Sequence, residues 1–178
     1  MGKNHGKPRN QHVLLCILFH MISIKELEHR MQPGAFSMKG FLGAGEKLTE
    51  VIAHDKETLN KLDLDFEDLA GGLESLLNVA IESRKEELII GLFEIRLKSF
   101  RGYQKCPWLQ EQDNSQCTIG GRVQYGSLDW EIKNRKIDLL LSGPGLIVHL
   151  IRDHHFFEGL ASPYRVDPLQ LARLLELV

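Results

Sequence analysis

The spacing of the hydrophobic residues changes in the middle of the chain, and this change restricts the fold classes open to it. Before the charged run at 82–87, hydrophobic residues recur every three or four positions, which is typical of an amphipathic helix. After this run they alternate with polar residues, which is typical of a strand with one exposed face. The helical stripe comprises Leu69, Leu73, Leu76, Leu77 and Ala80, and the alternating run comprises Phe93, Ile95 and Leu97. We therefore predict an α+β protein whose helices come first.

Capping and helix-breaking residues predict where the first helices begin. Ser23 and Glu26 have the spacing of a capping box, so a short helix is expected to begin after Ser23. Asp55 is predicted to cap a third short helix, and Asp65 a fourth. The Gly71-Gly72 pair within the fourth helix indicates either a close helix crossing or a break.

The second half is predicted to hold a hairpin followed by two helices. Leu128–Ile132 and Ile137–Leu141 read as the two strands of the hairpin. A helix with Pro144 in its first turn is expected to end at Gly159, and Asp167 starts a final helix. The predicted fold class is thus an N-terminal helical subdomain followed by a small antiparallel sheet of three or more strands with two C-terminal helices.

The sequence divides into three parts. Residues 1–20 are expected to be a poorly ordered or non-native leader, because the basic start and the short apolar run Val13–Phe19 only imitate a signal peptide. Met21 is then the expected natural start. A helical subdomain is predicted over 21–84, and an α+β subdomain over 85–178.

Charge and cysteine content exclude several classes of protein. The 178 residues carry 22 Lys and Arg against 24 Asp and Glu, and the net charge of -2 excludes a wholesale polyanion binder. Three scattered cysteines do not make a secreted disulfide framework. We therefore expect a soluble, intracellular, cytoplasmic protein that does not associate with a membrane.

Cysteines and histidines in the second half predict a metal site. Cys106 and Cys117 are expected in a loop between strands, and His149 and His154 on the following helix. Such a Cys2His2 set suits a structural zinc ion that joins a sheet to a helix. An ideal helix, however, places His149 and His154 about 140° apart, so the helix would have to unwind after Asp153 to bring them together.

Other roles for these residues remain open at this stage. The ideal helix places His149 and Asp153 on one face, as a ligand and its orienting carboxylate or as a surface ion pair. Both cysteines are alternatively buried structural residues or a disulfide pair between Cys106 and Cys117.

An enzyme is the competing class. The candidate catalytic residues are His149, Asp153, His154, His155 and Glu158. The tripeptide Asp153-His154-His155 resembles the short signature of the DHH phosphoesterases. That resemblance implies a metal pair that activates water for phosphoester cleavage, and hence a metal-dependent hydrolase. A charged residue beside an aromatic pair, as Glu158 is, is more often a surface feature.

A basic and aromatic stretch at 98–108 provides a third function class. Its candidate ligand-binding residues are Arg101, Tyr103, Lys105 and Trp108, and Lys98 and Phe100 precede them. Aromatic rings that stack bases beside cations that hold phosphates are typical of single-stranded nucleic-acid binding. The alternative is that Phe100 and Trp108 enter the core.

Taken together, these patterns favour a binding or interaction module with a structural zinc site. The expected partner is a protein or a small-molecule ligand, with single-stranded nucleic acid as a further alternative. Whether the chain is an enzyme stays open.

Overall fold

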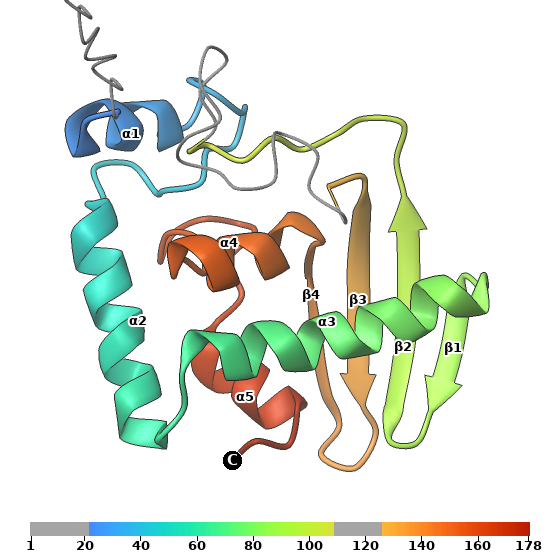
Figure 1. Cartoon of the computed structure of the whole chain (residues 1–178). Coiled ribbons are helices and arrows are strands. Elements are labelled where there is room, and N and C mark those ends of the chain that lie inside the picture. The colour runs from blue at the N-terminus through green and yellow to red at the C-terminus, as the bar shows by residue number, and fades with distance from the viewer. Residues whose placement is uncertain (1–21, 109–125) are drawn as a thin grey trace, which may run out of the picture.

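The computed structural model describes residues 22–108 and 126–178, which form five helices and one four-stranded antiparallel sheet (Figure 1). In chain order the elements are α1 (Ile24–Met31), α2 (Leu48–Leu62), α3 (Phe66–Ser83), β1 (Glu87–Ile90), β2 (Phe93–Ser99), β3 (Leu128–Asn134), β4 (Leu139–Pro144), α4 (Leu146–His154) and α5 (Pro168–Leu174). The predicted α+β class, with helices first and two helices last, is confirmed. The expected leader at 1–20 and the start at Met21 lie outside the described residues.

The sheet is a simple meander in which each strand pairs with its neighbours in sequence, in the order β1-β2-β3-β4. Figure 1 shows α3 lying across one face of this sheet, with α4 and α5 beside β4. The register pairs Ile95 with Ile132 and Trp130 with Gly143, and Ile95, Trp130 and Ile132 are buried. Because side chains alternate along a strand, this register places one apolar row against the helices.

The opposite face of the sheet carries charged side chains that pair across strands and along β2. Arg96 on β2 forms ion pairs with Glu87, Glu94 and Glu131, at 3.3, 2.7 and 3.1 Å. Such exposed pairs stabilise a protein only slightly. This face therefore explains the polar half of the alternation.

Side-chain caps start three of the helices where the sequence predicts them. The backbone N–H of Glu26 donates to the Ser23 hydroxyl, and Asp65 accepts from the backbone N–H of Asp68. Asp167 likewise accepts from the backbone N–H of Gln170 at the start of α5.

The predicted helix start at Asp55 is wrong. Asp55 does not cap a third helix, because α2 continues from Leu48 to Leu62 and the Asp55 side chain is buried against Arg165 at 2.5 Å. A tertiary ion pair thus replaces the expected cap.

The Gly71-Gly72 pair does not break α3, and a Cβ atom on Gly72 would lie 3.0 Å from Leu175. Of the two alternatives, close packing against a neighbouring segment is the correct one.

The helix after the hairpin is shorter than predicted. Pro144 is the last residue of β4, because Asp129 still pairs with it and the N–H of Gly145 donates to the Leu128 carbonyl. The helix ends at His154 rather than near Gly159. His155 takes a left-handed conformation with φ of 55°, and the N–H of Phe156 donates back to the Leu150 carbonyl. These bonds satisfy the last carbonyls of α4.

The predicted division at residue 84 falls between α3 and β1. Buried hydrophobic residues from both sides of it form one cluster, to which α3 contributes Leu69 and Leu73 and β3 contributes Trp130. Whether the two parts are separate subdomains stays a prediction. None of the helices within the described residues is long and apolar enough to cross a membrane.

Candidate metal centre

Three potential metal ligands from two distant segments meet above α4. Cys106 lies in the segment that follows β2, and His149 and His154 lie on α4. One candidate ligand atom from each residue lies within 4.8 Å of the others. Cys106 and His149 are buried, and His154 is half-buried. Of the four predicted ligands, the structure thus brings three together, and Cys117 lies outside the described residues.

The contacts within this cluster are close and directional. Cys106 Sγ lies 3.3 Å from His154 Nε2. The rings of His149 and His154 meet edge to face, with centroids 4.9 Å apart and planes at 89°. The thiol therefore points at one imidazole nitrogen while the second imidazole flanks the first.

Asp153 orients His149. Its Oδ2 lies 2.6 Å from His149 Nδ1, one helical turn further along α4, which confirms the predicted placement of the two residues on one face. Because the carboxylate engages Nδ1, His149 would bind a metal through Nε2. A carboxylate behind a histidine ligand fixes the ring and increases its basicity.

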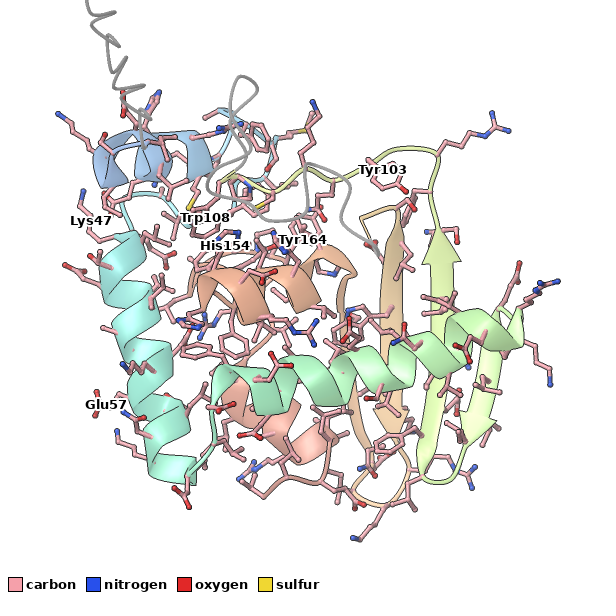
Figure 2. All side chains as sticks on the ribbon, in the orientation of Figure 1. Lys47, Glu57, Tyr103, Trp108, His154 and Tyr164 are labelled. Atoms are coloured by element: carbon pink, nitrogen blue, oxygen red, sulfur yellow. The ribbon has the colours of Figure 1, made fainter. Side chains whose placement is uncertain are left out.

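The expectation that His149 and His154 point apart is wrong, although α4 stays helical through His154. The indole of Trp108 stacks on the His154 ring, with centroids 4.0 Å apart and planes 5° apart. Figure 2 shows Trp108 and His154 together above α4. Tertiary packing on the last helical residue therefore sets the direction of this ring, and the helical repeat does not.

Burial lowers the pKa of both histidines. The pKa of His154 is lowered to about 4, chiefly by burial and also by the neighbouring His149. Burial also lowers the pKa of His149, although the Asp153 carboxylate opposes this shift. Neutral imidazole is the form that binds a metal, so the ligands need not lose protons from either histidine at neutral pH.

The donor set fits a zinc ion. With Zn–S and Zn–N distances of about 2.3 and 2.0 Å, a tetrahedral ion separates sulfur and nitrogen ligands by roughly 3.6 Å. The Cys106 to His154 distance of 3.3 Å is close to this value. A thiolate together with imidazoles binds zinc in preference to magnesium or calcium.

The other candidate catalytic residues are not among the three ligands. Asp153 contacts His149, whereas His155 stacks on Phe66 with ring centroids 4.3 Å apart. The ligand cluster contains His154 but neither Asp153 nor His155. The tripeptide that resembles the DHH signature is thus divided among three different contacts.

Glu158 is buried rather than at the surface. Its backbone is left-handed with φ of 67°, and its Oε2 accepts a hydrogen bond of 2.5 Å from the Ser162 hydroxyl. Its Oε1 has no hydrogen-bond partner among the described residues. Burial raises the pKa of Glu158 to about 7.

The candidate ligand-binding residues of the 98–108 stretch separate into two groups. Arg101, Tyr103 and Lys105 are exposed, whereas Trp108 is engaged with His154 and meets Phe156 edge to face. Phe100 is exposed and does not enter the core, so that alternative holds only for Trp108.

Sequence reasoning missed two relationships in this region. The stack of Trp108 on His154 joins positions 46 residues apart, and Tyr164 lies in the same hollow as Phe100. Neither relationship leaves a signal in local spacing.

No family model matches this sequence, and no curated protein or solved structure is significantly similar to it.

Proposed function

We propose that this protein is a binding module stabilised by a zinc ion that Cys106, His149 and His154 hold. The observation that carries this proposal is the convergence of the three ligand atoms within 4.8 Å. The ion would join the segment after β2 to α4, which lie 43 to 48 positions apart in sequence.

The burial of the ligands supports a structural role. Cys106 is fully buried and His149 is 3% exposed, whereas a catalytic metal needs a position open to substrate. The start of the segment is already held, because the N–H groups of Phe100 and Gln104 donate to the carbonyls of Ser127 and Gly126. A metal at Cys106 would fix a second point of this segment, so binding energy would contribute to folding.

Elemental analysis of protein purified without a metal-affinity tag tests the proposal. We expect about one zinc per chain, and loss of zinc in C106S, H149A and H154A. His155→Ala is the matched control, because His155 neighbours His154 but stacks on Phe66 outside the cluster. Wild-type protein without zinc, or equal zinc loss in His155→Ala, would contradict the proposal.

A metal-dependent hydrolase that uses His149, Asp153 and His154 is the second candidate. The observation that favours it is that three ligands meet within the described residues, since three protein ligands with a fourth open position are typical of catalytic zinc. Cobalt-substituted protein distinguishes the two. Added azide should leave the visible spectrum of a closed site unchanged, whereas a spectral shift would indicate an open position and favour the hydrolase.

A further inference from the structure

Exposed aromatic side chains gather where the chain leaves β2 and where α4 begins. Phe100, Tyr103 and Tyr164 are 46%, 58% and 41% exposed. Figure 2 shows Tyr103 and Tyr164 at this end of the molecule, above the start of α4. Large aromatic rings are costly to leave in water, so three of them at one place indicate a binding surface.

These rings line two neighbouring hollows. The first, of about 320 Å³, is lined by Phe100, Tyr103, Gln104, Leu128, Asp129 and Tyr164, among others. The second, of about 380 Å³, is lined by Phe36, Phe41, Tyr103, Gln104 and Lys105. Because both hollows share Tyr103 and Gln104, they adjoin, and together they make an extended track rather than one closed pocket.

Cations accompany the track. Lys98, Arg101 and Lys105 are exposed, and Lys98 lies over the Phe100 ring at 5.2 Å. Neither Arg101 nor Lys105 forms an ion pair with a described residue. Among the described residues that line the two hollows, Asp129 is the one acidic residue. In a chain of net charge -2 this is a local excess of positive charge.

We propose that this aromatic and basic track, comprising Phe100, Tyr103, Tyr164, Arg101 and Lys105, binds single-stranded nucleic acid. Unpaired bases stack on exposed rings, and cations beside the rings contact the phosphates. A polyanion fits these exposed cations, which form no ion pair with a described residue, and the open, adjoining shape of the hollows suits an extended strand. The track uses none of the proposed zinc ligands, so the two proposals stand separately.

Fluorescence anisotropy with a labelled oligothymidylate of about 12 nucleotides tests the proposal on the full chain. We expect binding at low salt that weakens as salt rises. Phe100→Ala, Tyr103→Ala and Tyr164→Ala should each weaken binding roughly fivefold or more. R101E and K105E should weaken binding and also reduce its salt dependence.

Matched controls separate this site from non-specific effects. Lys56→Glu removes an exposed cation on α2, and Leu140→Ala removes a side chain that is 52% exposed on the charged face of the sheet. Both should leave binding unchanged. Zinc content is measured for every variant, so an effect on the metal site is distinguished from an effect on the track. If Tyr103→Ala is unstable, Phe100→Ala or Tyr164→Ala decides the outcome.

Three results would overturn the proposal. The first is no binding at low salt. The second is unchanged binding in the aromatic variants together with full competition by inorganic polyphosphate, since charge alone would then account for the interaction. The third is tighter binding to a duplex of the same length, because paired bases do not offer their faces for stacking.

Discussion

The indole ring of Trp108 lies flat on the imidazole ring of His154, with centroids 4.0 Å apart and planes 5° apart. This stack joins the segment after β2 to the last residue of α4. It also holds the imidazole beside Cys106 Sγ, so the geometry of the cluster depends on a residue that is not itself a ligand.

Trp108→Ala should therefore reduce both stability and zinc affinity. Loss of the stack and of the half-buried ring should lower the free energy of unfolding by about 1–2 kcal/mol. Trp108→Phe keeps an aromatic face on His154 and should restore most of both quantities. Denaturant unfolding and competition with a chelator measure them. Equal effects of the two substitutions would show that stacking does not orient His154.

Asp153→Asn should weaken zinc binding about 10-fold to 100-fold, because the carboxylate that orients His149 is lost. The variant should retain one zinc per chain at saturating metal, unlike H149A. Asp138→Asn is a suitable control, since Asp138 is an exposed partner of Lys133. Unaltered affinity in Asp153→Asn would mean that the His149 and Asp153 contact is only a surface ion pair.

How far the sequence predicts this site is clear from individual residues. The contact between His149 and Asp153 follows from the helical repeat alone, and so does the capping of α3 by Asp65. The contact between His149 and His154 does not, because the stack with Trp108 decides where the His154 ring points. Sequence spacing predicts contacts within one helix, whereas side-chain direction at a helix end depends on partners that are distant in sequence.

The same limit explains the errors in the fold. Asp55 has the residue type of a helix cap, yet its partner Arg165 lies 110 positions away. Glu158 has the sequence context of a surface residue, yet its backbone conformation turns it inward to Ser162. In both cases a tertiary contact overrides a sound local preference.

The buried pair of Asp55 and Arg165 makes a prediction about stability. Burial raises the pKa of Asp55, and the hydrogen bond from Arg165 opposes this shift. Arg165 also donates to the Glu158 carbonyl at 2.6 Å. Asp55→Ala should lower the free energy of unfolding by about 3–5 kcal/mol, because it leaves a buried guanidinium without its counter-ion.

A double-mutant cycle checks this interpretation. The combined Asp55→Leu and Arg165→Met variant should be more stable than Asp55→Leu alone, since no charge is then left unpaired. Chemical unfolding at neutral pH measures each variant. Additive losses in the cycle would show that the two side chains do not interact.

The raised pKa of Glu158 predicts that the free energy of unfolding falls as pH rises from about 4.5 to 7. Its pKa is about 7 in the folded chain and near 4.5 when unfolded, so the folded state binds the extra proton within this range. The folded state is therefore favoured at low pH, and this contribution is lost as pH passes 7. Glu158→Gln removes the ionisation, so its stability relative to wild type should increase by up to about 3 kcal/mol from pH 4.5 to 8.

Unfolding of both proteins at several pH values measures that difference. Glu57→Gln is the control, because Glu57 is an exposed partner of Lys61 and its pKa is lowered rather than raised. A difference between Glu158→Gln and wild type that does not vary with pH would contradict the buried, protonated carboxyl.

The sequence-based prediction that Cys117 is the fourth zinc ligand has a matched control within the chain. Cys117 and Cys16 are both outside the described residues. Of these two cysteines, only Cys117 is predicted to bind the metal. Cys117→Ser should therefore weaken zinc binding to about the same degree as C106S, and Cys16→Ser should not. Cobalt-substituted protein gives a second measurement, because each thiolate ligand adds to the charge-transfer absorption, so Cys117→Ser should reduce that band while Cys16→Ser preserves it. An unchanged band in Cys117→Ser would leave Cys106 as the single thiolate, with the fourth position taken by another ligand or by water.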